Sequence, residues 1–319
     1  MPRPSRRIAL GIVGFGKIAR DCHVEAIGQS EGFFLHSIAD PAQLAAPARR
    51  HGSIDSMLAA PDAPEAVAIC TPPQARHRAA RHALACGKHV LLEKPPATTL
   101  SELEELCELA ERQGVTLFCA WHSRFAPAVA AAREWLAART PRRVQIDWRE
   151  DVRDSHPGQR WIFEPGGFGV FDPGINALSV ASIILPKRLI VRDALLKFPV
   201  NCATPIAADL TFADSDATPI TASFDLLHTG RWIREIAVET DTQRLLLSRG
   251  GDRLSLDGRE LPLGASAEYP ALYAHFAELI ATGRSDVDST PLELVADAFL
   301  LARRENAPEF VDETAAAAP

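Results

Sequence analysis

The stretch GFGKIA at residues 14–19 follows directly on an apolar run at residues 7–13, RIALGIV. It matches the pattern G-x-G-x-x-G/A, in which the first glycine permits a tight turn and the second lets the backbone approach a pyrophosphate. The start of the following helix then offers free backbone N–H groups to that anion. The stretch therefore predicts a dinucleotide-binding strand, turn and helix, and a purely structural glycine turn is the alternative. The residues expected to contact the cofactor here are Gly14, Phe15, Gly16, Lys17 and Ile18.

Asp40 ends the next predicted strand, residues 33–39. It lies at about the 20-residue spacing where a carboxylate binds the ribose diol of NAD. A carboxylate there repels the 2′-phosphate of NADP, and the next residue is Pro41 rather than a cation. The sequence thus predicts NAD as the preferred cofactor. NADP remains possible, because Arg49 and Arg50 could meet a phosphate if their segment folds back. Alternatively, Asp40 and Pro41 only start a turn.

Strand and helix patterns alternate along residues 1–122. Strand patterns at residues 66–70, 89–92 and 115–120 are separated by helix patterns. Such alternation predicts right-handed βαβ units and a parallel sheet. We therefore expect an α/β fold whose N-terminal Rossmann domain covers residues 1–122.

Residues 123–319 show a different pattern, in which several strand-like runs follow one another with short turns. That order is typical of an antiparallel sheet. The predicted helices of this region cover about residues 125–138, 173–185, 268–282 and 291–304. We expect a C-terminal α+β domain with an open, mostly antiparallel sheet. Its tail, about residues 307–319, has little to bury and should be loose.

Charge and hydropathy exclude two classes of partner. The chain of 319 residues has 34 Lys and Arg against 41 Asp and Glu, a formal net charge of −7, whereas broad nucleic-acid binding needs a basic face. No apolar run approaches the ~20 residues of a membrane span. The six cysteines form no CxxC pair, which favours reduced thiols and a cytoplasmic protein. The alternative is an export signal at residues 5–7, SRR, but the apolar run continues into the glycine turn without a cleavage site.

Lys94 follows an apolar strand pattern within the stretch EKPP, residues 93–96. Ligands bind at the carboxyl ends of parallel strands, where a lysine ammonium can hydrogen-bond a substrate hydroxyl and stabilise developing negative charge. This position predicts a catalytic lysine. A solvated surface lysine beside a turn is the alternative.

Asp172 and Asn176 are four residues apart at a predicted helix start, so their side chains face the same side. Asp172 precedes Pro173 and could alternatively serve only as the helix cap. The preceding GGFG, residues 166–169, would let the backbone approach a ligand. His156 lies in a polar loop near Glu150 and is predicted to be functional, with a merely solvated histidine as the alternative.

Four motifs together resemble the glucose–fructose oxidoreductase/inositol dehydrogenase (Gfo/Idh/MocA) family. They are GFGKIA at 14–19, TPP at 71–73 with His77, EKP at 93–95, and GG at 166–167 followed by Asp172. The resemblance implies a second domain whose open sheet covers the cofactor and often mediates oligomer contacts, so a homo-oligomer through the C-terminal sheet is possible. It also implies further cofactor-binding residues, namely Thr71, Pro72, His77, Glu93 and Lys94.

Longer stretches resemble one branch of that family, the bacterial L-arabinose/D-galactose 1-dehydrogenases. These stretches are WHSR at 121–124, EDVR at 150–153, HPGQ at 156–159, EPGG at 164–167 and VFDPGINALS at 170–179. The resemblance implies oxidation of an aldopyranose at C1 to the aldonolactone with NAD(P)+. It implies catalytic roles for Lys94, Asp172, His156 and Asn176, and substrate binding by Glu150 and His122.

Asn176 departs from the wider family, which has histidine as the base at this position. An amide cannot accept the proton, so we expect Asp172 to be the base, or otherwise His156. No metal is expected, because the histidines lack ligand spacing and the nicotinamide accepts the electrons. The alternatives are another sugar or inositol dehydrogenase of the family, or a sugar- or dinucleotide-sensing regulator on the same fold.

Overall fold

The computed structural model describes residues 6–42, 45 and 47–312. The chain divides into two units. The first comprises residues 1–122 and 267–289, and the second residues 123–266 and 290–319. Residues 267–289 thus group with the first unit, whereas the sequence analysis placed everything after residue 122 in the second domain.

The first unit is built on a parallel sheet with six strands among the described residues, in the order β3-β2-β1-β4-β5-β6. The strands are β1 (Ile8–Val13), β2 (Phe33–Ala39), β3 (Arg49–His51), β4 (Ala66–Ile69), β5 (His89–Glu93) and β6 (Leu117–Ala120). This is the strand order of a Rossmann fold, whose ligands bind outside the carboxyl ends of the strands. The prediction of an N-terminal Rossmann sheet is therefore confirmed, although β3 was not foreseen.

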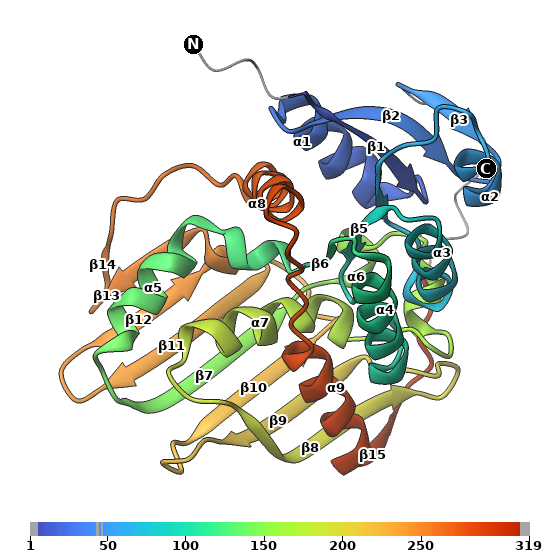
Figure 1. Cartoon of the computed structure of the whole chain (residues 1–319). Helices are drawn as coiled ribbons and strands as arrows, with labels where there is room; N and C mark the ends of the chain where they lie inside the picture. Colours follow the sequence, from blue (N-terminus) through green and yellow to red (C-terminus); the bar gives the residue numbers. More distant parts are fainter. Residues whose placement is uncertain (1–5, 43–44, 46, 313–319) are drawn as a thin grey trace. The chain divides into compact units, whose positions relative to one another are not determined.

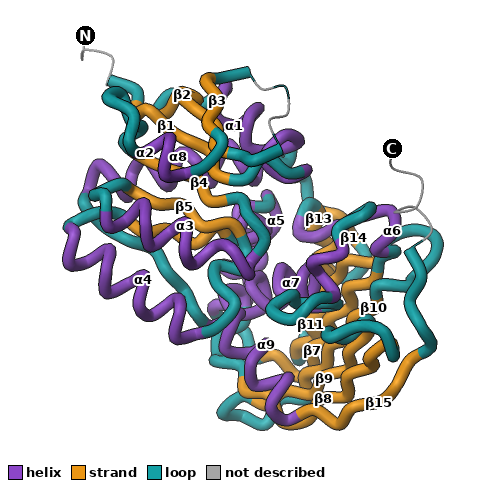
Figure 2. The backbone as a smooth tube through the Cα atoms, turned by 90° about the vertical axis from the view of Figure 1, so that its right-hand side faces the viewer, coloured by secondary structure: helices purple, strands orange, loops and turns teal. Residues whose placement is uncertain are grey.

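Helices flank this sheet, and Figure 2 shows α3 and α4 side by side along it. The helices are the π-helix Ala19–His23, α1 (Val24–Gln29), α2 (Ile54–Leu58), α3 (Pro73–Ala85), α4 (Leu100–Gln113) and α8 (Glu268–Thr282). Aromatic contacts explain why α8 belongs here: the ring of Phe276 stacks on Phe33 of β2 and on Phe118 of β6. A helix far along the sequence thus completes the core of the first unit.

The second unit contains a sheet of nine strands within the described residues, in the order β14-β13-β12-β11-β7-β10-β9-β8-β15. The strands are β7 (Pro141–Arg149), β8 (Ile190–Pro199), β9 (Ala207–Ala213), β10 (Ile220–Asp225), β11 (Ile233–Thr240), β12 (Arg244–Ser248), β13 (Arg253–Leu256), β14 (Arg259–Glu260) and β15 (Ala302–Ala307). Two pairs, β10 with β7 and β15 with β8, are parallel, and the others are antiparallel. The predicted open, mostly antiparallel sheet is confirmed.

One face of this sheet is covered by α5, α7 and α9 (Figure 1). The helices of the unit are α5 (Pro127–Ala137), α6 (Val152–Ser155), α7 (Phe171–Ile184) and α9 (Thr290–Leu301), with short 3-10 turns at His122–Phe125, Arg160–Phe163 and Arg249–Gly251. The side chains that alternate with the buried ones on β9 are polar, for example Asp209 and Thr211. An oligomer through this sheet stays a prediction.

The end of the chain differs from the sequence expectation. Where a helix was predicted to run to residue 304, α9 ends at Leu301 and β15 pairs with β8 through residue 307. Phe310 then donates its backbone N–H to Asn201 Oδ1 at 3.0 Å. The rest of the predicted loose tail, residues 313–319, lies outside the described residues. No helix of the described residues is long and apolar enough to cross a membrane.

Candidate active site

The glycine turn lies at the carboxyl end of β1. Gly14 has a φ of 87°, and a Cβ there would lie 2.8 Å from the backbone nitrogen of Thr71. Only glycine therefore fits this turn, which lies against the end of β4. A Cβ on Gly16 would meet no heavy atom within 4 Å, so space remains at the second glycine. The turn thus fits a dinucleotide pyrophosphate, as the sequence predicts.

Asp40 fastens this turn to the end of β2. Its Oδ2 accepts a hydrogen bond from the backbone N–H of Phe15 at 2.7 Å, and its Oδ1 accepts one from Ala42 at 2.7 Å. The Asp40 carboxylate therefore shapes the local turn, as the alternative interpretation predicted. Its position at the end of β2 is also the one predicted for a carboxylate that binds the ribose of NAD.

The segment with Arg49 and Arg50 does fold back beside Asp40. The backbone N–H of Asp40 donates to His51 O at 3.0 Å, and β3 pairs with the end of β2. Arg49 forms an ion pair with Asp62 at 2.7 Å. The strand β3, which carries Arg49 and Arg50, thus lies beside Asp40, the carboxylate predicted to bind the ribose.

Arg76, which the sequence analysis missed, holds two loops at the edge of the sheet. Its guanidinium is buried and donates to Glu93 O at 2.7 Å, to Pro95 O and to Thr71 O. Two of these carbonyls flank Lys94, and the third belongs to Thr71, the first residue of the TPP motif. The predicted cofactor residue His77 instead pairs with Glu105 of α4. Arg76, rather than His77, therefore makes the hydrogen bonds that hold these loops.

Lys94 lies at the carboxyl end of β5, in a turn with a cis peptide bond between Lys94 and Pro95. Glu93, predicted to bind the cofactor, is only 2% exposed. Its carboxylate accepts hydrogen bonds from His23 Nε2 at 2.9 Å, from the Tyr269 hydroxyl at 2.8 Å and from the backbone N–H of Lys94 at 2.9 Å. The structure thus places Glu93 in the interior, bonded to protein groups.

His122 follows β6, begins the 3-10 turn at residues 122–125 and packs against α8. Its ring stacks on Tyr269 with centroids 5.4 Å apart, and its Nδ1 lies 2.5 Å from a carboxylate oxygen of Glu268. The side chain is 17% exposed. His122 is therefore a partly accessible group of the first unit, and its predicted contact with substrate stays a prediction.

In the second unit, α7 presents Asp172 and Asn176 on one buried side. Asp172 is 2% exposed and Asn176 8%. The helix cap is Val170, and Asp172 lies inside the helix, so the cap-only alternative is wrong. The GGFG segment was predicted to let the backbone approach a ligand. In the structure its backbone instead approaches another part of the chain, because a Cβ on Gly167 would lie 2.3 Å from Trp161 O.

His156 joins Asp172 to Glu150. Its Nε2 lies 3.2 Å from Asp172 Oδ2, and its Nδ1 lies 3.9 Å from Glu150 Oε1. Three predicted site residues from different elements therefore meet in one cluster. The solvated-loop alternative for His156 does not hold.

Glu150 is fully buried, and only one of its two carboxylate oxygens accepts a hydrogen bond from the described residues. Oε2 accepts hydrogen bonds from Arg234 Nε at 2.9 Å and from its Nη2 at 2.6 Å. Sequence analysis missed Arg234, which lies on β11. Glu150 Oε1 and Asn176 Oδ1 are buried without a hydrogen-bond partner among the described residues. Buried acceptors of this kind are rare unless a ligand or water uses them.

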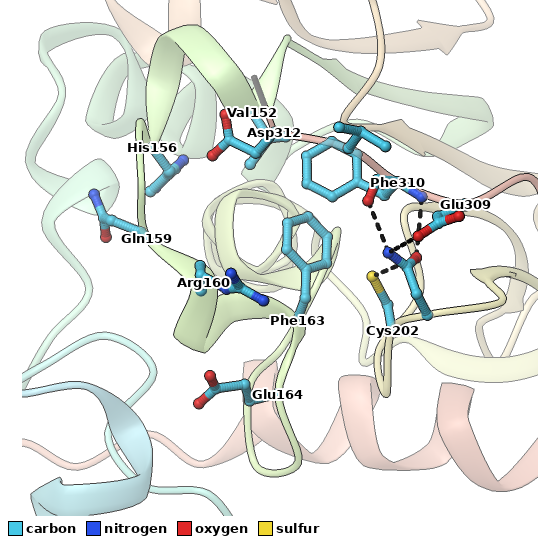
Figure 3. Close-up of a pocket in the computed structure, with 12 residues that line it drawn as sticks. Val152, His156, Gln159, Arg160, Phe163, Glu164, Cys202, Glu309, Phe310 and Asp312 are labelled. Atoms are coloured by element: carbon cyan, nitrogen blue, oxygen red, sulfur yellow. Dashed lines mark hydrogen bonds between the residues drawn. The ribbon is translucent and has the colours of Figure 1, made fainter. Parts of the chain in front are cut away.

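A cavity of about 290 Å³ adjoins the His156 loop (Figure 3). The Asn201 amide, one of its walls, donates to Phe310 O at 2.8 Å and so fastens the chain end there. The cavity is lined by Val152, His156, Gln159, Arg160, Phe163, Glu164, Asn201, Cys202, Glu309, Phe310, Val311 and Asp312. Of the polar cluster, only His156 lines it. No group of three or more His, Cys, Asp or Glu that could hold a metal occurs in the described part of the chain.

Comparison with known proteins identifies the family of the chain. Residues 8–120 match the profile of an oxidoreductase family with an NAD-binding Rossmann fold, GFO_IDH_MocA. The galactose 1-dehydrogenase of Pseudomonas fluorescens is 44% identical over 305 residues, which cover 96% of this chain and 99% of the relative. The chain belongs to the Gfo/Idh/MocA oxidoreductase family.

Two solved structures resemble this chain in fold. The crystal structure of a D-galactose-1-dehydrogenase from Rhizobium etli matches with a TM-score of 0.91 and 48% identity, over 96% of this chain and 98% of that chain. KijD10, a 3-ketoreductase from Actinomadura kijaniata solved with NADP, matches with a TM-score of 0.78 and 17% identity, over 95% and 100% of the two chains. That second likeness concerns the Gfo/Idh/MocA fold alone.

Proposed function

We propose that this oxidoreductase is an aldose 1-dehydrogenase that oxidises C1 of D-galactose, L-arabinose or both to the aldonolactone with NAD(P)+. The observation that carries the proposal is the buried cluster of His156, Asp172, Glu150 and Asn176, in which two acceptor oxygens accept no hydrogen bond from the described residues. Similarity to two galactose 1-dehydrogenases over nearly the whole chain supports the substrate class.

Proton removal is assigned to the His156–Asp172 pair, with Asp172 as the base. A carboxylate at this position can take the C1 hydroxyl proton while the hydride leaves. His156 Nε2 lies 3.2 Å from Asp172 Oδ2 and therefore orients that carboxylate. If Asp172 serves only to orient the imidazole, His156 is the base instead.

Lys94 is assigned to the same C1 oxygen, where its ammonium donates a hydrogen bond and stabilises developing negative charge. Its place at the carboxyl end of β5 supports this role, because parallel sheets bind their ligands at that edge. NAD(P)+, when bound, supplies the hydride acceptor. The glycine turn at residues 14–19 and Thr71 would hold it.

Sugar recognition is assigned to Glu150 Oε1 and Asn176 Oδ1. Each is a buried acceptor that a ring hydroxyl can satisfy. Leaving such an acceptor without a donor costs about 1–3 kcal/mol. A sugar that lacks the matching hydroxyl would therefore be rejected.

The cofactor preference is proposed to be NAD, because the Asp40 carboxylate would repel a 2′-phosphate. The adjoining Arg50 on β3 is the feature that supports use of NADP as well. The comparison of NADH and NADPH formation distinguishes the two.

The decisive experiment measures initial rates of NADH and NADPH formation with L-arabinose, D-galactose, D-xylose, D-glucose and myo-inositol. Turnover with arabinose or galactose, faster with NAD+, is the expected result. Turnover with NADP+ alone would keep the reaction and contradict the assignment of Asp40. Tight dinucleotide binding without turnover of any sugar would overturn the enzyme assignment in favour of a sensor.

A further inference from the structure

A buried polar network surrounds the residue that precedes Lys94. Glu93 accepts hydrogen bonds from His23 Nε2 at 2.9 Å and from Tyr269 at 2.8 Å, and His23 Nδ1 lies 2.7 Å from the Tyr273 hydroxyl. His23 is fully buried. The four side chains come from the π-helix, β5 and α8. This cluster lies inside the first unit and none of its members has been assigned a part in catalysis.

The network ends on Lys94 itself. Glu93 Oε2 accepts a hydrogen bond from the backbone N–H of Lys94 at 2.9 Å, while Oε1 faces His23 and Tyr269. The carbonyl groups on either side, Glu93 O and Pro95 O, accept hydrogen bonds from Arg76. The backbone of the lysine is thus held through its N–H and through the carbonyls that flank it.

Charge strengthens the contact between His23 and Glu93. Burial alone raises the pKa of Glu93, but the hydrogen bond and charge of His23, aided by His122 and Tyr269, lower it to about 2. Burial alone lowers the pKa of His23, but Cys70, Tyr273 and Glu93 raise it well above its ordinary value. Both shifts favour the charged form of the group concerned, and a hydrogen bond between charged groups is stronger than one between neutral groups.

A purely structural role would be to fasten α8 to the sheet. Apolar packing already does so, since Phe276 stacks on Phe33 and Phe118. A buried ion pair is seldom more stabilising than apolar side chains of the same volume. The ion pair instead contributes directional bonds, and the last of them holds the N–H of Lys94.

We propose that His23, Glu93 and Tyr269 are positioning residues that hold Lys94 in the orientation it needs toward the C1 oxygen. The inference rests on the proposed function of Lys94. A catalytic group displaced by about 1 Å can lose 10²-fold in rate. Breaking the network therefore lowers kcat while the KM values for sugar and cofactor change little.

Paired variants test this with matched shapes. His23→Gln keeps a donor near the Nε2 position, toward Glu93, whereas His23→Asn is too short to reach it. Tyr269→Phe removes the hydroxyl bonded to Glu93, whereas Tyr273→Phe removes one bonded only to His23. We expect His23→Asn and Tyr269→Phe to lower kcat at least about tenfold. The matched variants, His23→Gln and Tyr273→Phe, should lower kcat clearly less. His275→Gln, also on α8 but with the imidazole bonded to Asp286 instead of Glu93, is the control and keeps the wild-type kcat.

A double-mutant cycle with Lys94→Met separates positioning from stability. If the network acts through the lysine, His23→Asn causes no further loss of kcat in the Lys94→Met background. The inference would be overturned if the kcat losses of His23→Asn and Lys94→Met were fully additive. It would also be overturned if the kcat loss of every variant simply followed its loss of Tm, wherever the substituted residue lies. If Lys94→Met itself keeps wild-type turnover, the proposed role of Lys94 fails and the inference fails with it. Normal kcat in both His23→Asn and Tyr269→Phe, with Lys94→Met inactive, refutes the inference alone.

A second readout needs no turnover. The rate at which an amine-reactive acylating reagent labels Lys94, measured by peptide mass spectrometry on the protein without cofactor, should change in His23→Asn and Tyr269→Phe. Lys88, at the opposite end of the same strand, serves as the internal control and should label at the wild-type rate. An unchanged labelling rate at Lys94 in both variants would contradict the proposal.

Discussion

Each unit of the protein buries a cluster built from one histidine and at least one carboxylate, and the clusters differ in how their oxygens are used. In the first unit, both oxygens of Glu93 accept hydrogen bonds from His23, Tyr269 and Lys94. In the second, Glu150 Oε1 and Asn176 Oδ1 accept no hydrogen bond from the described residues.

That difference indicates that the first cluster holds a residue in place, whereas the second is able to bind a substrate. A satisfied network holds one arrangement and has nothing further to bind. Buried acceptors left open carry a desolvation cost that a ligand with hydroxyl groups can remove. We therefore assign the cluster of Glu93 to positioning, and the cluster of His156 to the substrate.

The largest effect is expected from Asp172→Asn. The amide keeps the shape of the side chain but cannot accept the proton, and positioned base catalysis is worth about 10²–10⁴-fold. kcat should fall by at least about 10²-fold, with little change in Tm, in steady-state assays with the best sugar. His156→Asn is the companion variant. Near-normal turnover in Asp172→Asn together with loss in His156→Asn would make His156 the base.

A stability effect is expected from Glu93 in acid. Its pKa of about 2 lies below the ordinary 4.5, so its stabilising contribution is complete above that ordinary value and is lost as the pH falls toward 2. The groups around it are His23, Tyr269, Tyr273, Cys22, Cys70 and His122. Denaturant unfolding between pH 7 and pH 3 should show a steeper acid loss in the wild type than in Glu93→Gln.

An exposed carboxylate provides the control for that measurement. Glu105 has a lowered pKa because of hydrogen bonds from His77 and Arg81, but it lies near the surface, where ion pairs contribute little. Glu105→Gln should leave the acid slope close to that of the wild type. Equal slopes for the wild type and Glu93→Gln would show that the buried pair makes no charge-dependent contribution.

A smaller effect is expected from Asn176→Ala. Loss of one neutral hydrogen bond of about 1–1.5 kcal/mol should raise the KM for the sugar about tenfold, with a lesser change in kcat. Monodeoxy galactoses identify the hydroxyl concerned, because one of them should bind the variant and the wild type equally well. A variant that loses the same factor with every deoxy sugar would contradict direct recognition by Asn176.

The parts of this site that the sequence predicts are those set by local spacing. The glycine turn follows its strand directly, and Asp172 and Asn176 share a helix face because they are four residues apart. Two of the missed residues come from distant parts of the chain: Tyr269 lies 176 residues from Glu93, and Arg234 lies 84 from Glu150. No local pattern links such pairs, since only the packing of α8 and β11 brings them together.

The edges of the fold were hard to predict for a related reason. β3 and β15 consist mostly of charged or polar residues, so no apolar alternation announces them. Each is stabilised by pairing with a neighbouring strand rather than by burial of its own side chains. The strands with a buried face, by contrast, could be predicted from their apolar patterns.

The smallest effect is expected from His77→Ala, which tests a prediction made from family resemblance against the observed contacts. His77 is a partly exposed side chain paired with Glu105, and Arg76 holds the carbonyls of Thr71, Glu93 and Pro95 instead. Because surface pairs contribute at most about 1 kcal/mol, the KM for NAD+ should change less than about fivefold. Isothermal titration with NAD+ gives the same comparison without turnover. A tenfold weaker binding would place His77 among the cofactor-binding residues after all, and its pairing with Glu105 would then be a contact that gives way when the dinucleotide binds.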